Sequence, residues 1–151
     1  MNRMERIKEK FKVLLEYLCS LEKEGFEFVE DLNEKHCLVL ADGYIPHGHH
    51  SESWNYTIDV NRTYILKKSE QRYAVIEGAY SFYDTSNYED EKEFPCLVLL
   101  ELPKGKNYPW EIECSTTKER EKLCKSIKEF YKISEDKLER QKPWWLEHNF
   151  S

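Results

Sequence analysis

The stretch from Trp54 to Tyr83, WNYTIDVNRTYILKKSEQRYAVIEGAYSFY, decides the fold. Apolar side chains recur at every second position on both sides of a polar segment, 67–71, and this alternation is typical of two strands joined by a turn. The sequence therefore predicts a long antiparallel hairpin. In its first strand the apolar side chains share one parity, so we expect one face to carry Trp54, Tyr56, Ile58, Val60, Tyr64 and Leu66.

Arg62 interrupts that apolar face. If Lys67 pairs with Arg72, the register of the hairpin places Arg62 opposite Glu77. A charge on an apolar face is costly unless it is paired, so a cross-strand ion pair is one interpretation. The other is a cleft in which the arginine binds a small anionic ligand, such as a nucleotide, between tyrosine rings. The candidate ligand-binding residues are Arg62, Tyr56, Tyr64, Tyr73 and Glu77, with Tyr83 as a further wall.

Other strands are predicted on both sides of this hairpin. They cover residues 26–30, 37–41, 94–102 and 110–114. The first two are expected to be joined by a hairpin turn at 31–35, and 42–53 reads as a loop. Sequential strands with short connections favour an antiparallel sheet of about six strands.

Residues 3–24 are predicted to form an amphipathic helix. Gly25 is expected to end it in the left-handed conformation. Apolar side chains recur at steps of three and four along it: Met4, Ile7, Phe11, Leu14, Leu18 and Leu21. This stripe has two interpretations, packing on the sheet or a coiled-coil seam that joins two copies in a homodimer.

The region 117–142 is predicted to be helical. Thr116 and Glu119 form a capping box at its start. A second short helix is expected between Ser134 and Pro143, and the apolar tail 143–151 follows. The apolar face of the first helix is expected to contain Leu123, Ile127 and Phe130.

Together these elements predict a single α+β domain over residues 1–151. Its strand-rich region, 26–114, would form the sheet, and the helices would cover it. Of the 151 residues 14% are aromatic, with only 5 Gly and 5 Pro, which excludes a collagen-like or wholly disordered chain.

Charge and hydropathy narrow the class of partner and the location. The formal net charge of -6 disfavours nucleic acid as a partner. No apolar run approaches the roughly 20 residues that span a bilayer, and no secretory signal is visible. We therefore expect a cytoplasmic protein without a membrane contact, whose cysteines are reduced and buried. The abundance of residues with AT-rich codons suggests a bacterial or phage source.

Three histidines lie within four residues of the chain: His47, His49 and His50. Imidazole is a common ligand of zinc, nickel and copper, so a divalent metal is the cofactor that this cluster would hold. Additional ligands could come from Asp42, Glu52, His36 or His148. The spacing of the three clustered histidines matches no zinc signature, and a solvated polar loop is the alternative interpretation.

Two segments are candidates for contact with a protein partner. The acidic loop 84–93 contains Glu89 and Asp90; a solvated loop is the simpler interpretation, and a surface that docks a basic partner is the main alternative. The tail contains Trp144 and Trp145, and tryptophan is enriched at binding hot spots. Packing of the tail on its own domain is the alternative.

No nucleophile elbow or Gly-rich phosphate loop occurs in the sequence. The leading hypothesis is therefore a cytosolic, non-enzymatic binding module for a protein or a small anionic ligand. Inhibitors and immunity-type proteins of bacteria and phages are of this kind. The alternatives are a small metal-dependent hydrolase that uses His47, His49 and His50, and a structural homo-oligomer joined by the N-terminal helix.

Metal analysis separates the hydrolase from the binding module. The hydrolase hypothesis predicts near-stoichiometric zinc or manganese in protein purified without a His-tag. Changing His47 and His49 together to Ala should then remove the metal, because both are proposed ligands. A metal-free protein would exclude the hydrolase.

Overall fold

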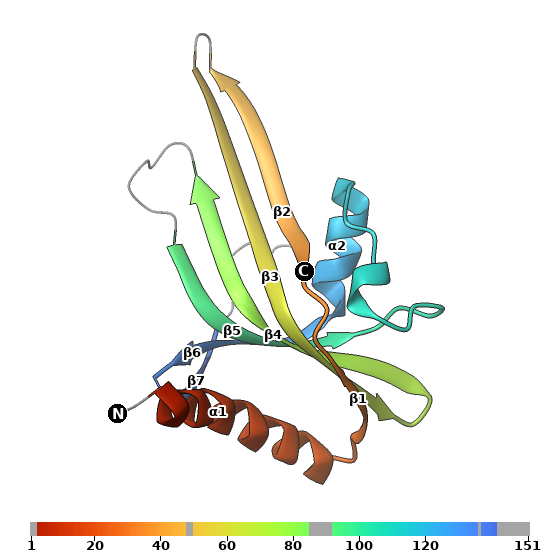
Figure 1. The fold of residues 1–151 in the computed structure, drawn as a ribbon. Coiled ribbons are helices and arrows are strands. Elements are labelled where there is room, and N and C mark those ends of the chain that lie inside the picture. The colour runs from red at the N-terminus through yellow and green to blue at the C-terminus, as the bar shows by residue number, and fades with distance from the viewer. Residues whose placement is uncertain (1–2, 48–49, 85–91, 136, 142–151) are drawn as a thin grey trace.

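One antiparallel sheet of seven strands carries a helix on each side (Figure 1). The computed structural model describes residues 3–47, 50–84, 92–135 and 137–141, and side chains within 12–42, 55–82, 93–135 and 137–141. The α+β fold predicted from the sequence is confirmed. The helices are α1 (Arg3–Lys23) and α2 (Thr117–Ser126), with a short 3-10 helix, η1 (Pro109–Glu111). The strands are β1 (Glu27–Leu32), β2 (His36–His47), β3 (His50–Lys68), β4 (Gln71–Asp84), β5 (Lys92–Glu101), β6 (Ile127–Ser134) and β7 (Lys137–Arg140).

The predicted hairpin, β3 and β4, forms the centre of the sheet. Lys67 pairs with Arg72 and Arg62 pairs with Glu77, as the sequence register predicted. The remaining strands follow on either side in the order β1-β3-β4-β5-β6-β7, and β2 pairs with β3. The β2–β3 hairpin projects beyond the other strands (Figure 1).

A β-bulge at Asn61 changes which face the side chains of β3 occupy. Val60 pairs with Gly78 and Arg62 with Glu77, so Asn61 is an extra residue on β3. Side chains alternate between faces along a strand, so one extra residue moves all later side chains to the other face. The prediction that Val60 and Tyr64 share a face is therefore wrong.

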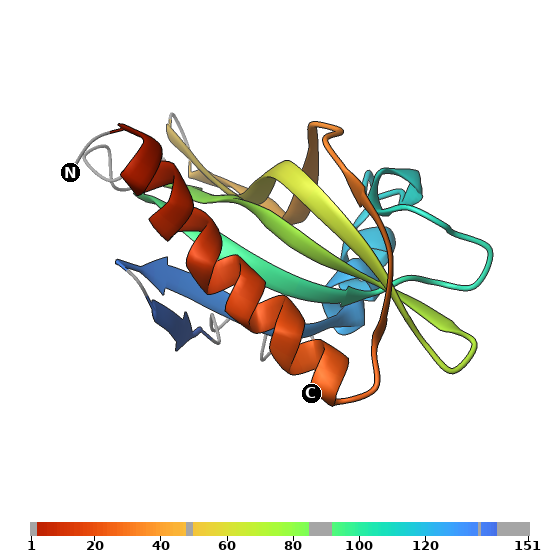
Figure 2. The ribbon, with the colours of Figure 1, turned by 60° about the horizontal axis from the view of Figure 1, so that its bottom comes forward.

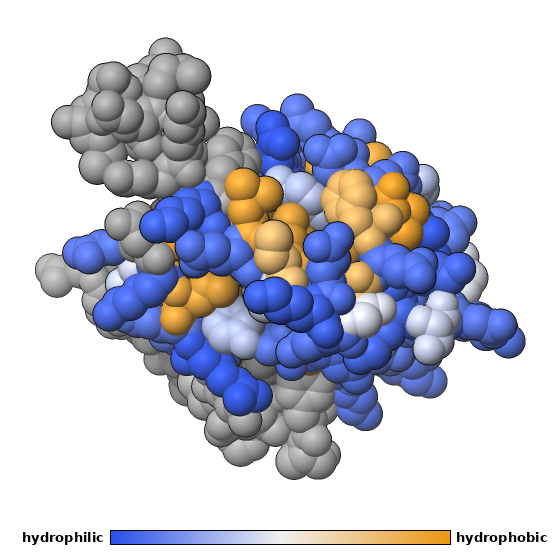
Figure 3. Space-filling model, turned by 90° about the horizontal axis from the view of Figure 1, so that it is seen from below, coloured by the Kyte–Doolittle hydropathy of each residue, from blue (hydrophilic) through white to orange (hydrophobic). Residues whose placement is uncertain are grey.

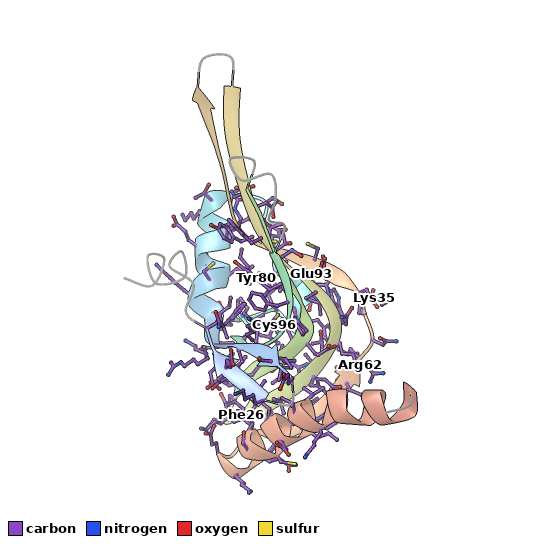
Figure 4. All side chains as sticks on the ribbon, turned by 90° about the vertical axis from the view of Figure 1, so that its left-hand side faces the viewer. Phe26, Lys35, Arg62, Tyr80, Glu93 and Cys96 are labelled. Atoms are coloured by element: carbon purple, nitrogen blue, oxygen red, sulfur yellow. The ribbon has the colours of Figure 1, made fainter. Side chains whose placement is uncertain are left out.

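The sheet consequently separates two hydrophobic cores. The larger core lies between the sheet and α2, and Figure 4 shows Tyr80 and Cys96 within it. In that core Leu123 and Cys124 of α2 are buried against the sheet. The smaller core lies between the sheet and α1 and contains Leu14, Tyr17, Leu21, Phe26, Tyr64, Leu66, Val75, Leu97 and Leu99.

The path from β1 to β2 differs from the expected hairpin. Both strands pair with β3 and not with each other: β1 pairs with residues 63–67 and β2 with residues 50–60. Residues 33–35 therefore interrupt one edge of the sheet instead of reversing the chain. The loop predicted over 42–53 is also wrong, because β2 and β3 continue through it to His47 and His50.

The C-terminal region is helical only as far as Ser126. The capping box of Thr116 and Glu119 is present, but β6 and β7 replace the helices expected over 127–142. In β6, Lys128 is an extra residue, because Leu100 pairs with Ile127 and Leu99 with Glu129. This bulge places apolar side chains three residues apart on one face, which imitates helical spacing.

The strand expected at 110–114 is also absent. Residues 109–111 form η1, in which Pro109 occupies the first turn. Proline suits that position because its missing N–H has no partner at the start of a helix. A carboxylate oxygen of Glu111 also accepts hydrogen bonds from the backbone N–H groups of Asn107 and Tyr108 at 2.8 and 2.9 Å.

Helix α1 lies across one face of the sheet, with β6 and β7 beside it (Figure 2). Leu14 and Leu21 are each only 2% exposed, so these two residues of the predicted stripe pack on the sheet. Gly25 ends the helix with φ +99°, as predicted, and the N–H of Phe26 donates to the carbonyl of Leu21. Among the described residues, no helix is long and apolar enough to cross a membrane.

Gly78 permits the close approach of the two strands at the bulge. A Cβ atom at this position would lie 2.3 Å from the carbonyl oxygen of Asp59. We expect Gly78→Ala to lower the free energy of unfolding by about 3 kcal/mol, because the backbone of β3 must shift. Urea unfolding measures the change. Ser81→Ala on the same strand is the control, and equal midpoints for the two variants would contradict the prediction.

Candidate functional site

An open groove of about 410 Å³ lies between α1 and the β6–β7 hairpin. The first and the last described elements of the chain therefore form its two walls, which lie side by side in Figure 2. Seen from the α1 side, the surface is mainly hydrophilic, with apolar side chains in separate patches (Figure 3). The groove is lined by Val13, Glu16, Tyr17, Ser20, Leu21, Glu24, Glu129, Tyr131, Lys137 and Leu138.

Glu129 is held by two tyrosine hydroxyls. The hydroxyl of Tyr17 donates to Oε1 of Glu129, and the hydroxyl of Tyr131 donates to Oε2, each at 2.5 Å. The two rings meet edge to face with their centroids 5.5 Å apart. Because Tyr17 comes from α1 and the other two residues from β6, this cluster ties the helix to the strand.

Both hydroxyls keep their protons well beyond neutral pH. Burial raises the pKa of Tyr131 to about 12, and its hydrogen bond to Glu129 and the negative charge there add to the effect. The same three causes, with burial again the largest, raise the pKa of Tyr17 further above its ordinary value of 10. Tyr17 and Tyr131 therefore act as donors to Glu129.

A third hydroxyl in the groove also donates to the protein. Ser20 Oγ donates to the backbone carbonyl of Tyr17 at 2.6 Å. Carboxylates at Glu16 and Glu24 line the same groove, and Lys137 contributes its one ammonium group. The side chains that line the groove thus offer mostly hydrogen-bond acceptors and an excess of negative charge.

The sequence analysis did not select this cluster. Tyr17 lies on the buried face of α1, three residues after Leu14 and four before Leu21. This helical spacing indicates from the sequence that Tyr17 faces the sheet. Glu129 lies within 117–142, the region predicted to be helical. If 127–134 had been interpreted as a strand, the alternation would have placed Glu129 and Tyr131 on one face.

The structure brings together only part of the candidate site around Arg62. Glu77 pairs with Arg62, while Tyr64 and Tyr73 belong to the core on the same, α1, side of the sheet. Tyr56 belongs to the core on the α2 side, because the bulge separates it from the others. The labelled Arg62 lies on the α1 side in Figure 4.

The surroundings of Arg62 give it a structural partner. Glu77 is only 8% exposed and lies directly across from it in the hairpin. Burial raises the pKa of the Tyr64 hydroxyl, while its hydrogen bond with Arg62 and the positive charge there act in the opposite direction. This neighbourhood supplies both a carboxylate and a phenol to the guanidinium, so it favours a structural role over anion binding.

The histidine cluster lies at the end of the β2–β3 hairpin. His47 ends β2 and His50 begins β3, but their side chains and all of His49 lie outside what the structure describes. His36 begins β2, so it lies roughly 36 Å from His47 at about 3.3 Å per residue and cannot share a metal with it. Among the described residues, no three His, Cys, Asp or Glu side chains form a metal-binding group.

Three further proposed metal ligands have different outcomes. Asp42 forms an ion pair with Arg120, and its Oδ1 lies 2.8 Å from Nη2 of the arginine. Glu52 lies on β3, but its side chain is outside the described part, and His148 is outside it altogether.

The candidate partner-binding residues are not described by the structure. Glu89 and Asp90 fall within 85–91, and Trp144 and Trp145 fall within 142–151, both outside the described residues. Their role stays a prediction.

The cysteines, all of which lie in the described part of the chain, form no disulfide and differ in their exposure. Cys96 and Cys124 are buried, as expected, whereas Cys19 and Cys37 are exposed and Cys114 is half-buried. Desolvation raises the pKa of Cys37 to about 11 and that of Cys96 to about 12. These two groups therefore stay protonated at neutral pH, which is the opposite of an activated nucleophile.

Comparison with family models, curated proteins and solved structures found no match to this chain. The function must therefore be inferred from the geometry of the groove and its chemistry.

Removing the hydroxyl of Tyr17 tests whether the cluster holds α1 on the sheet. We expect Tyr17→Phe to lower the free energy of unfolding by about 2 kcal/mol, because a buried hydrogen bond to a carboxylate is lost. Urea unfolding with tryptophan fluorescence measures it. The matched control is Tyr73→Phe in the same core, which leaves Glu129 with both donors and should cost less. A Tyr17→Phe midpoint within error of the wild type would contradict the prediction.

The raised tyrosine pKa values predict a loss of stability at alkaline pH. In the folded state Tyr131 has a pKa near 12, above the ordinary value of 10. Its contribution is therefore complete below pH 10 and is lost as the pH rises toward 12. We expect the unfolding midpoint of the wild type to fall over this range more steeply than that of Tyr131→Phe. Parallel curves would show that Tyr131 does not contribute.

Proposed function

We propose that this chain is a cytosolic, non-enzymatic binding module that docks a positively charged segment of a protein partner in the groove between α1 and β6–β7. The observation that carries the proposal is the Glu129 carboxylate, held at the floor of an open groove by Tyr17 and Tyr131. A carboxylate fixed in this way does not need to be ordered again when a ligand binds, which lowers the entropic cost of binding.

Charge complementarity selects the kind of segment. Glu16 and Glu24 line the groove together with Glu129, against the ammonium of Lys137 and the guanidinium of Arg140, which lies opposite Tyr131 in the β6–β7 hairpin. The whole chain carries a formal net charge of -6. Complementary charge increases the association rate and disfavours like-charged partners, so a basic segment fits and an acidic one is repelled.

The size of the groove suits a side chain or two rather than a large cofactor. Its volume of about 410 Å³ is near the lower end of ordinary ligand pockets, which run from roughly 300 to 1,000 Å³. The apolar lining from Val13, Leu21 and Leu138 would pack the aliphatic stem of a long basic side chain.

This proposal narrows the hypothesis drawn from the sequence. A protein partner is retained, in the manner of small inhibitors and immunity-type proteins. The small anionic ligand at Arg62 has less support, because Glu77 lies across from that guanidinium. The stripe of α1 has less support as a self-association seam, because Leu14 and Leu21 are buried within the chain.

An NMR titration with charged peptides tests the docking site. We expect a twelve-residue peptide containing Lys and Arg to shift backbone amide signals of α1 and β6–β7. An acidic peptide of the same length should cause no shifts there. Affinity should fall as salt increases, because exposed charges are screened.

Substitutions on the rim of the groove refine that experiment. Removing an attractive charge with Glu16→Gln should weaken binding roughly two- to fivefold, and removing a repulsive one with Lys137→Gln should strengthen it by a similar factor. Glu22→Gln is the matched control, because Glu22 lies on the same helix but does not line the groove. Shifts confined to other elements, or no binding at all, would overturn the proposed function.

A further inference from the structure

The geometry points to the guanidinium of an arginine side chain, in preference to a lysine ammonium, as the group that the floor of this groove recognises. The inference rests on the proposed function and adds the identity of the recognised group. It follows from the direction of the hydrogen bonds around Glu129.

The hydroxyl groups that line the groove present acceptors because their own protons are already used in hydrogen bonds. Tyr17 and Tyr131 donate to Glu129, and Ser20 donates to a backbone carbonyl. Each of these hydroxyl oxygens keeps acceptor capacity. Each carboxylate oxygen of Glu129 has accepted one hydrogen bond and retains a second acceptor site. A matching ligand should therefore be rich in donors.

Guanidinium fits that description better than ammonium does. It has five N–H donors in a planar fork and no acceptor, whereas ammonium has three donors arranged around one nitrogen. The fork can bond both oxygens of Glu129 at once, and its remaining N–H groups can reach the oxygens of Tyr17 and Tyr131. An ammonium satisfies fewer of these acceptors at the same time.

The aromatic rings add a second preference for guanidinium. Tyr17 and Tyr131 meet edge to face at 5.5 Å and both line the groove. A planar guanidinium can stack on a tyrosine face while its edge bonds to a carboxylate, and it is less strongly hydrated than ammonium. A tyrosine whose hydroxyl donates to Glu129 can therefore also provide the ring face on which the guanidinium stacks.

Three peptides that differ in one residue provide the test. Each is a capped heptapeptide of Gly and Ser whose central residue is Arg, Lys or citrulline, the uncharged isostere of Arg. Binding to the full chain is measured from amide shifts. We expect the Arg peptide to bind about tenfold more tightly than the Lys peptide, as one additional charge-assisted hydrogen bond would give. The citrulline peptide should bind more weakly than both.

Variants of the protein locate the preference. Glu129→Gln should remove most of the Arg-over-Lys ratio, because it removes the carboxylate that the fork engages. Glu16→Gln should weaken both peptides in the same proportion and leave their ratio unchanged. Far-UV circular dichroism checks folding, and if Glu129→Gln does not fold, Tyr131→Phe takes its place and should also lower the ratio.

The outcomes separate this inference from the proposed function. Equal affinities for Arg and Lys, with shifts in the groove, overturn the guanidinium preference and leave the binding module standing. An Arg preference that persists in both Glu129→Gln and Tyr131→Phe also overturns it. If neither these peptides nor the twelve-residue basic peptide binds the groove, the proposed function fails.

Discussion

The extra residue at Asn61 is the constraint on which the two cores depend. Before it, the even-numbered side chains of β3 face α2, and after it they face α1. One strand can therefore supply Tyr56 to one core and Tyr64 to the other without breaking its ladder to β4. Gly78 is opposite this point, where the backbone of Asp59 leaves no room for a Cβ atom. The bulge at Asn61 therefore depends on a glycine at position 78.

The hydrogen bond between Tyr17 and Glu129 combines a structural role with the recognition role that we propose for the groove. As structure, it fixes α1 against β6 in the smaller of the two cores. The hydrogen bond also orients the Glu129 carboxylate. Because the hydroxyl protons of Tyr17 and Tyr131 are donated to that carboxylate, the groove presents hydrogen-bond acceptors to a ligand. Groups held by their own packing and hydrogen bonds make precise binding sites, because little freedom remains to be lost. The stability of the fold and the proposed selectivity of the groove thus depend on the same carboxylate.

The sequence predicted local features well where one principle dominated. The pairing of residues 62–67 of β3 with 72–77 of β4, the end of α1 at Gly25 and the capping box at Thr116 all follow from short-range rules, and all are present. It failed where a bulge altered the periodicity. At Lys128 the bulge placed apolar residues at a spacing of three, which matches a helix as well as a strand.

The candidate site was missed for a related reason. The candidate residues drawn from the sequence are close along the chain, such as the three histidines, or opposite each other in a predicted hairpin, such as Arg62 and Glu77. Tyr17 and Glu129 are 112 positions apart, and no hairpin register connects them. Only the packing of α1 on β6 brings them together. Tyrosine and glutamate at these positions carry no motif, so composition and spacing could not identify them.

Building a groove from α1 and β6–β7 has a consequence for synthesis of the protein. Because a ribosome releases the chain from its N-terminal end, α1 emerges long before its partners on β6 and β7. A nascent or truncated chain without 127–140 lacks one wall of the groove and the carboxylate at its floor. The groove is therefore complete only after β6 and β7 have emerged and packed against α1.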